Sequence, residues 1–258
     1  MLRFYQFGDG IFTTILKFEG KFIALKPHFT RISNGCRLLN LTNPFQDISE
    51  FSAFLESSSD QQSEIIKLII SSGETERLYQ RKTGKVDVFI EKRNLSSNLQ
   101  NLRNSGISLS ISDLDYQPPF SDLSFLKLAN YQPWSVIRNH NPFGYDTVCR
   151  NSDEILEATS GSVLLQTGNK FFTNLNHSNV LHSVTIDCFL EFAALKNLPL
   201  EKRKITVFDV EDSDSVFYAN AAHGIIPVSE IKFGKQKFDY KLNSSVAEEF
   251  WKFYTACD

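Results

Sequence analysis

Methionine, cysteine, net charge and long apolar runs are all scarce in this chain of 258 residues. The formal net charge is only −3 and the basic residues are scattered, which argues against a nucleic-acid partner. No apolar run is long enough to span a membrane, and the first residues lack the apolar stretch of a secretory signal. These absences predict a soluble cytoplasmic protein. The four cysteines are widely spaced, so we expect reduced, mostly buried thiols at Cys36, Cys149, Cys188 and Cys257.

Several familiar functional motifs are also missing. The chain contains neither a G-x-G-x-x-G fingerprint nor a P-loop, and it has no G-x-S-x-G nucleophile turn. His177 and His182 have no paired cysteine or acidic helix motif beside them, so no metal site is expected. Standard dinucleotide, nucleotide-triphosphate, serine-hydrolase and metal chemistries are therefore not indicated.

The residues that are present predict an aromatic-rich core of mixed strands and helices, because apolar residues make up 41% of the chain and 23 residues are phenylalanine. Alternation and β-branched residues predict strands over 11–18, 22–25, 64–73, 85–93, 107–113, 145–149, 155–165, 171–173, 203–207, 215–219 and 225–228. A turn at Gly168 joins two of these strands. Helical spacing predicts helices from Pro27 onward and over 47–57, 128–140, 183–196 and 241–254.

The segment 114–123 contains adjacent prolines and shows no periodicity, so it is the best candidate for a linker. The sequence therefore predicts an α+β fold of two lobes. A small N-terminal lobe would span residues 1–113, and a larger C-terminal lobe would span residues 124–258.

Four short segments remain, and each has an ordinary structural explanation when it is taken alone. Gly8–Gly10 is typical of a turn entering a strand, and His28–Arg31 of an exposed arginine on a helix. Lys127 is flanked by apolar residues, which is the setting a Schiff-base lysine needs, although for this segment alone a surface lysine opening a helix is the better explanation. Glu157–Ser162 is typical of a polar turn between strands.

In this order and spacing the four segments resemble the fold-type IV pyridoxal-phosphate enzymes, the class IV aminotransferase family. That family includes branched-chain and D-amino acid aminotransferases and aminodeoxychorismate lyase. The resemblance extends from about residue 6 to residue 230. It implies a small α/β lobe, a larger lobe with a barrel-like sheet, and a homodimer acting on small molecules. Family members usually carry a longer segment before the glycine motif, so we expect the edge of the small lobe to differ here.

The resemblance also implies roles for individual residues. Lys127 would form the Schiff base with pyridoxal 5'-phosphate, Glu157 would pair with its pyridine nitrogen, and Arg31 would bind its phosphate. The family's G-I-T-R pattern at a helix start corresponds to Ser183–Ile186, where the Gly and the Arg are replaced. The full set of cofactor-binding residues that it implies is Lys127, Arg31, Glu157, Val184, Thr185, Asn220, Ala221, Ala222 and Tyr131.

Thr13 distinguishes between members of the family. Aminotransferases of this group usually have glutamate at this position, whereas the run F-G-D-G-I-F-T-T is similar to aminodeoxychorismate lyase. Arg77 and Tyr79 match the spacing of a substrate-binding loop of the lyases, although Arg77 has an equally good explanation as a surface arginine.

The implied reaction converts 4-amino-4-deoxychorismate to p-aminobenzoate and pyruvate, a step of folate biosynthesis. Lys127 would act first as base and then as acid, assisted by Thr13 or Thr14. One alternative is a branched-chain or D-amino acid aminotransferase of the same family. The other is a relative without catalytic activity that acts as a binding protein.

Overall fold

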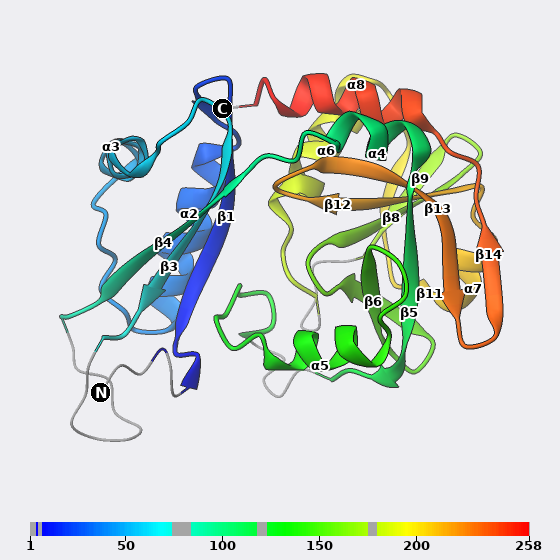
Figure 1. Ribbon diagram of the computed structural model, residues 1–258, viewed down its shortest axis with the longest axis horizontal. Helices are drawn as coiled ribbons and strands as arrows, with labels where there is room; N and C mark the ends of the chain where they lie inside the picture. The colour runs from blue at the N-terminus through cyan, green and yellow to red at the C-terminus, as the bar shows by residue number, and fades with distance from the viewer. Residues whose placement is uncertain (1–3, 5–6, 74–83, 118–122, 175–179, 258) are drawn as a thin grey trace. The chain divides into compact units, whose positions relative to one another are not determined.

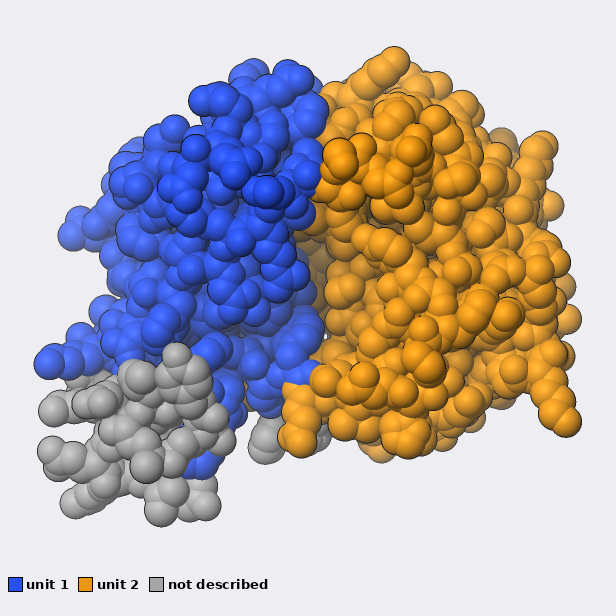
Figure 2. All heavy atoms as spheres, viewed as in Figure 1, with its two compact units in different colours: residues 1–95, 126–131, 256–258 blue, residues 96–125, 132–255 orange. Residues whose placement is uncertain are grey.

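The computed structural model describes residues 4, 7–73, 84–117, 123–174 and 180–257. The chain divides into two compact units, coloured separately in Figure 2. Unit 1 comprises residues 1–95, 126–131 and 256–258, and unit 2 comprises residues 96–125 and 132–255. Both contain strands and helices, which confirms the predicted two-lobed α+β class. Within the described ranges, no helix has the length and hydropathy needed to cross a membrane.

Unit 1 is built on a four-stranded antiparallel sheet of order β2-β1-β3-β4, of which β1, β3 and β4 are labelled in Figure 1. Its elements are β1 (Gly10–Phe18), β2 (Lys21–Phe22), α2 (Leu25–Leu38), α3 (Ile48–Ser58), β3 (Glu64–Ser71) and β4 (Asp87–Asn94). Helix α2 packs closely against β1. At Gly35 of α2 an added Cβ would lie only 2.7 Å from Cδ1 of Ile11 on β1. The face of β1 that carries Ile11 therefore lies against the helix.

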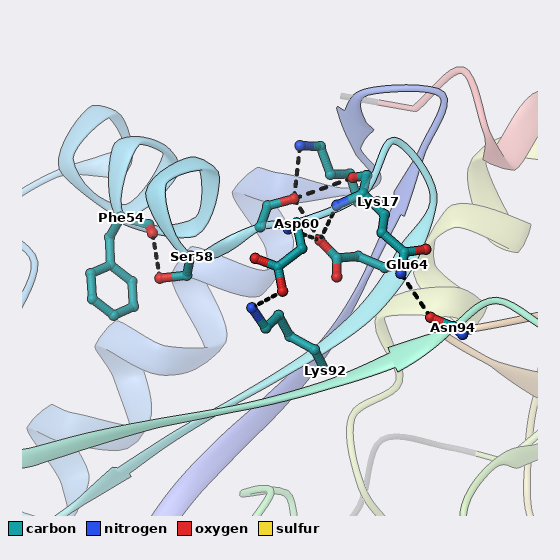
Figure 3. Close-up of polar contacts among 9 residues, drawn as sticks. Lys17, Phe54, Ser58, Asp60, Glu64, Lys92 and Asn94 are labelled. Carbon is teal, nitrogen blue, oxygen red and sulfur yellow. Dashed lines mark hydrogen bonds and ion pairs between the residues drawn. The ribbon is translucent and has the colours of Figure 1, made fainter.

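Charged side chains are buried where β3 begins, next to the turn that follows α3 (Figure 3). Glu64 is 2% exposed, and its Oε1 accepts hydrogen bonds from Ser59 Oγ at 2.6 Å and from the backbone N–H of Asp60 at 2.9 Å. Lys17 Nζ, also buried, donates to Glu56 Oε1 at 3.0 Å and to Ser59 Oγ at 2.8 Å. Burying these charges is tolerated because each of them has hydrogen-bond partners.

Unit 2 contains a ten-stranded sheet that runs β10-β9-β8-β12-β13-β5-β6-β7-β11, with β14 paired to β13. Its strands are β5 (Ile107–Asp115), β6 (Asp146–Asn151), β7 (Glu154–Ala158), β8 (Ser162–Thr167), β9 (Lys170–Thr173), β10 (Leu200–Lys202), β11 (Ile205–Thr206), β12 (Ser215–Asn220), β13 (Gly224–Phe233) and β14 (Gln236–Asp239). Its helices are α4 (Leu99–Ser105), α5 (Gln132–His140), α6 (Val184–Leu195), α7 (Val207–Glu211) and α8 (Ser244–Tyr254).

The sheet of unit 2 curls back on itself. Its two end strands, β10 and β11, are separated in the chain only by Arg203 and Lys204, so the two edges of the sheet lie close together. Asn174 strengthens the closure, because its Nδ2 donates to the carbonyl of Ile155 at 2.7 Å and its Oδ1 accepts from the N–H of Ile205 at 3.1 Å. The barrel-like sheet that the resemblance implied is thereby confirmed.

Phenylalanine fills the space between the helices and the sheet of unit 2. Ring contacts join Phe189 and Phe192 of α6 to Phe250 of α8, with centroids 5.3 and 5.6 Å from the Phe250 ring. Phe171 of β9 contacts Phe189 at 5.3 Å. All four rings are buried, so much of the unusual phenylalanine content serves this core.

Some predicted elements differ from the structure, among them the strand expected over 22–25, which ends at Phe22 because α2 begins at Leu25. The expected strand over 155–165 is two strands, β7 and β8, since the chain turns at residues 159–161 and the N–H of Ala158 donates to the carbonyl of Gly161 at 2.8 Å. The expected helix over 128–140 begins only at Gln132, because residues 126–131 pair with β1 instead. Periodicity did not indicate α4, α7, β10 or β14.

The first division between the units lies between Leu95 and Ser96, earlier in the chain than the proline-rich segment. Strand β5 was expected in the N-terminal lobe, but its ladder hydrogen bonds run to β13 and β6. It therefore belongs to the sheet of unit 2. Residues 118–122 of the expected linker lie outside the described residues.

We expect Glu64→Gln to lower the free energy of unfolding by about 1–3 kcal/mol, because the buried cluster loses its charge-assisted hydrogen bonds. Chemical denaturation measures this change. Asp60→Asn is the matched control in the same cluster, since Asp60 pairs with Lys92 at an exposed position and should contribute less than about 1 kcal/mol. Equal effects of the two changes would contradict the role given to Glu64.

Candidate active site

The segment that carries Lys127 is held by β1. The N–H of Phe12 donates to the carbonyl of Lys127 at 2.9 Å, and the N–H of Ala129 donates to the carbonyl of Gly10 at 2.9 Å. Ile11 and Leu128 form an antiparallel bridge between the same segments. A lysine remote in sequence is thereby fixed against the strand that follows the glycine motif.

The two glycines of the G-D-G motif are required by close packing. Gly8 has φ +57°, and an added Cβ would lie 2.7 Å from the Cα of Asn130. At Gly10 an added Cβ would lie 2.5 Å from the carbonyl oxygen of Ile70 on β3. Asp9 between them is buried, and its carboxylate accepts a hydrogen bond from Ser72 Oγ at 2.8 Å. Gly8 therefore lets the glycine motif pack directly against Asn130 in the segment that carries Lys127, and Gly10 lets β1 pack against β3.

The amine of Lys127 lies among aromatic rings. Nζ donates to the hydroxyl of Tyr131 at 3.0 Å. It lies 4.8 Å from the ring centroid of Phe12 and 5.5 Å from that of Tyr131, and the two rings meet edge to face at 5.0 Å. The rings fix the direction of the long lysine side chain, and the tyrosine hydroxyl gives the amine a partner for proton exchange.

A buried histidine accompanies the arginine of α2. Thr13 Oγ1 and His28 Nδ1 share a hydrogen bond of 2.7 Å, and both side chains are completely buried. Burial lowers the pKa of His28 well below its usual value, and the positive charges of Arg31 and Lys127 lower it further. His28 is therefore neutral at physiological pH, beside the positive charges of Arg31 and Lys127. Such a region suits an anionic ligand.

Thr13 and Thr14 point to opposite faces of β1, since side chains alternate along a strand and the pairing with β3 has no bulge here. Thr13 faces α2, where it bonds to His28. Thr14 shares the other face with Phe12, whose ring contacts Lys127. Of the two threonines, Thr14 thus lies on the face of the lysine amine.

In unit 2, Glu157 is a buried residue near the end of β7. Burial raises the pKa of Tyr116 and of Cys149, and the negative charge of Glu157 raises both pKa values further. Both neighbours therefore stay protonated at neutral pH. Glu157 thus has two groups beside it that carry no charge at neutral pH.

The other predicted cofactor residues of unit 2 lie at the start of α6 and after β12. Ser183 caps α6, its Oγ accepting from the N–H of Ile186 at 3.3 Å, and Val184 and Thr185 of the first turn are buried. Asn220 Oδ1 accepts from the N–H groups of Ala222 and His223 at 3.1 and 3.0 Å, and Tyr254 OH donates to the carbonyl of Ala221 at 2.9 Å. Both segments are therefore held in fixed conformations.

Asp146, which the sequence analysis did not single out, organises the residues around this turn. It is 2% exposed, and its Oδ2 accepts from Ser160 N–H at 3.0 Å, Ser160 Oγ at 2.7 Å and Tyr218 OH at 3.0 Å. Thr159 Oγ1 donates to Oδ1. Asn220 Nδ2 in turn donates to Tyr218 OH at 3.1 Å. One carboxylate thus supports both the turn after Glu157 and the Asn220 segment.

Asp146 carried no signal of its function in the sequence, where a lone strand aspartate is ordinary, and His28 was noted there only as the first residue of the segment that ends at Arg31. Their roles follow from burial and from partners remote in the chain. Arg77 and Tyr79, predicted to bind substrate, lie outside the described residues.

Residues 10–231 match the family described as amino-transferase class IV. The chain is similar to a D-alanine aminotransferase of Listeria monocytogenes, with 20% identity over 95% of this chain and 86% of the relative. It is similar to the solved structure of a putative 4-amino-4-deoxychorismate lyase from Legionella pneumophila, with a TM-score of 0.84 and 19% identity over 97% of this chain and 91% of that one. A hypothetical aminotransferase from Mycobacterium tuberculosis in its PLP-bound form has a TM-score of 0.82 and 19% identity, over 99% and 92% of the two chains.

The chain belongs to the class IV aminotransferase family, and the predicted fold-type IV architecture is confirmed. It is a pyridoxal-phosphate-dependent enzyme. The described residues suit that cofactor. An amine beside a tyrosine hydroxyl suits its aldehyde, the cationic surroundings of His28 suit its phosphate, and the buried Glu157 suits its pyridine nitrogen.

We expect Asp146→Asn to lower the free energy of unfolding by at least about 2 kcal/mol, because the amide places donors against Ser160 and Tyr218, which are donors themselves. The variant should also bind pyridoxal phosphate more weakly, as titration of its visible absorption measures. Tyr218→Phe removes one partner only and should have the smaller effect on both quantities. A variant with normal cofactor affinity would contradict this role of Asp146.

His28 predicts a pH dependence of stability. Its folded pKa lies below the unfolded value of about 6.5, so the unfolded state binds more protons once the pH falls below 6.5. The free energy of unfolding should therefore decrease from pH 6.5 downward, by at most about 1.4 kcal/mol per pH unit for this group. His223, whose pKa burial lowers to about 4, adds a similar contribution.

Thermal unfolding between pH 7 and 5 measures the effect. His28→Asn should reduce the pH dependence of Tm, and adding His223→Gln should reduce it further. An unchanged slope in the double variant would rule out both assignments.

Proposed function

We propose that the protein is an aminodeoxychorismate lyase, which converts 4-amino-4-deoxychorismate to p-aminobenzoate and pyruvate. The observation that carries the proposal is Thr13 at the position where aminotransferases of the family usually have glutamate. The hydroxyl of Thr13 shares a hydrogen bond with the neutral His28. This position of β1 therefore carries a hydroxyl and no carboxylate. The similarity to a putative lyase of this type supports the proposal.

Lys127 is the residue that would bond the cofactor and move protons. Bound pyridoxal phosphate supplies a ring that accepts electrons from the substrate. When substrate displaces Lys127, the free Nζ can remove the proton from the amine-bearing ring carbon. The same Nζ can then deliver that proton to the enolpyruvyl methylene as the carbon–oxygen bond breaks, which releases pyruvate and leaves the aromatic product. Phe12 and Tyr131 keep the amine oriented throughout.

The remaining residues would bind and orient. Arg31, the first turn of α6 with Val184 and Thr185, and the segment Asn220–Ala222 would hold the phosphate, and Glu157 would keep the pyridine nitrogen protonated. Arg77 and Tyr79 would hold substrate, and Thr14 would assist proton transfer from the face of β1 that it shares with Phe12. A homodimer in the cytoplasm completes the proposal, as the family resemblance implies.

The second candidate is an amino acid aminotransferase, which the similarity to D-alanine aminotransferase supports. The two reactions differ in their products. A lyase forms p-aminobenzoate and pyruvate in equal amounts, whereas an aminotransferase moves an amino group to an oxo acid.

We expect the purified holoenzyme to form p-aminobenzoate, measured by its fluorescence, and pyruvate, measured by a coupled assay, from 4-amino-4-deoxychorismate. Lys127→Ala should abolish both products and the visible absorption of the bound cofactor. Lys92→Ala, a change at an exposed lysine of β4, should leave all three unchanged. Rapid transamination of D-alanine or branched-chain amino acids without p-aminobenzoate would overturn the lyase proposal.

A further inference from the structure

The turn Asn220–Gly224, which follows β12, is supported by two helices of unit 2. Helices α4 and α8 lie side by side, and both pack against β13 (Figure 1). Gly224 has φ +68°, and an added Cβ would lie 3.3 Å from Cε3 of Trp251 on α8. Three residues further along α8, Tyr254 OH donates to the carbonyl of Ala221 at 2.9 Å. Helix α8 therefore contacts the turn at two points, Ala221 and Gly224.

Arg103 of α4 is a buried cation beside Trp251. It is 3% exposed, and its guanidinium carbon lies 4.4 Å from the centroid of the Trp251 ring. Nε donates to Glu248 Oε1 at 3.0 Å and Nη2 donates to Gln100 Oε1 at 3.2 Å, whereas Nη1 has no hydrogen-bond partner in the part of the chain that the structure describes. The side chain of Glu248 is 29% exposed, so solvent screens its charge more than that of the guanidinium. The positive charge of Arg103 is therefore only partly neutralised.

The charge of Arg103 acts on the turn. Burial, together with the positive charge of Arg103, lowers the pKa of His223 to about 4. His223 is therefore neutral at physiological pH, and its Nδ1 shares a hydrogen bond of 3.3 Å with Tyr145 OH. The start of α6, Ser183–Ile186, contains no basic residue either. Arg103 thus supplies positive charge to a turn that carries none of its own.

We propose that Arg103 determines cofactor specificity, its positive charge making the turn Asn220–Gly224 prefer pyridoxal phosphate over unphosphorylated pyridoxal. The inference rests on one part of the proposed function, that the segment Asn220–Ala222 holds the phosphate. A phosphate carries close to two negative charges at neutral pH, and a poorly solvated cation attracts it without direct contact. Arginine suits this role because it stays charged when it is buried.

The test compares how tightly the apoenzyme binds pyridoxal phosphate and pyridoxal, by titration of the visible absorption of each bound aldehyde. Arg103→Met should weaken the binding of pyridoxal phosphate by about threefold to tenfold, the range for two charges separated by a layer of protein. The binding of pyridoxal should not change, because pyridoxal lacks the phosphate. Arg103→Lys keeps the charge and should restore most of the preference.

Glu248→Gln is the matched control, because it breaks the same ion pair and keeps the charge of Arg103. Arg103→Met and Glu248→Gln should both lower the free energy of unfolding. Only Arg103→Met should lose preference for pyridoxal phosphate, whereas Glu248→Gln should keep or increase it. Equal losses in the two variants would assign the pair a purely structural role and contradict the inference, as would an unchanged preference in Arg103→Met.

Asn220→Ala separates this inference from the proposed function. Asn220 Oδ1 accepts from the N–H groups of Ala222 and His223, so its loss removes the hydrogen bonds that fix the turn and should weaken the binding of pyridoxal phosphate but not of pyridoxal. If Asn220→Ala has this effect and Arg103→Met has none, the role of Arg103 alone is wrong. An unchanged preference in Asn220→Ala would refute the binding of phosphate at this turn, and the inference with it. An enzyme with the expected preferences that forms no p-aminobenzoate would refute the lyase proposal alone.

Discussion

The pairing of β1 with the segment 126–131 is the constraint on which the chemistry of unit 1 depends. Two backbone hydrogen bonds join Phe12 and Gly10 to this segment, and they leave the side chain of Lys127 over the Phe12 ring. Gly8 allows the backbone of Asn130 to approach where a side chain would collide, and Gly10 does the same for the backbone of Ile70 on β3. A side chain at position 8 would therefore displace the segment that carries Lys127 without contacting Lys127 itself.

Buried polar groups have a comparable importance in both units, and in each case the physical reason is that a desolvated charge must be given partners. Glu64 organises the turn after α3, and Asp146 organises the turn after Glu157. His28, in contrast to these two carboxylates, is buried in its neutral form, since burial and two nearby cations both disfavour its charged form.

The sequence predicted most strands and helices correctly, because alternation and helical spacing are local properties. It failed where a long-range contact overrides local preference, as at residues 128–131, which pair with β1 instead of extending α5. It also assigned β5 to the first lobe. The partners of a strand depend on hydrogen bonds to remote segments, in this case to β13 and β6, and no local pattern specifies them.

The sequence by itself determined the family and the cofactor and indicated Lys127 as the candidate Schiff-base lysine, because motifs in a fixed order survive even when overall identity is low. Only the tertiary structure decided which residues surround that lysine. It turned Thr13 toward His28 and left Thr14 on the face of Phe12, and it gathered Lys67 at the same ring. The physical reason is that the pleat of a strand sets the direction of each side chain, and the register with the next strand sets its neighbours. Both exist only in the folded chain.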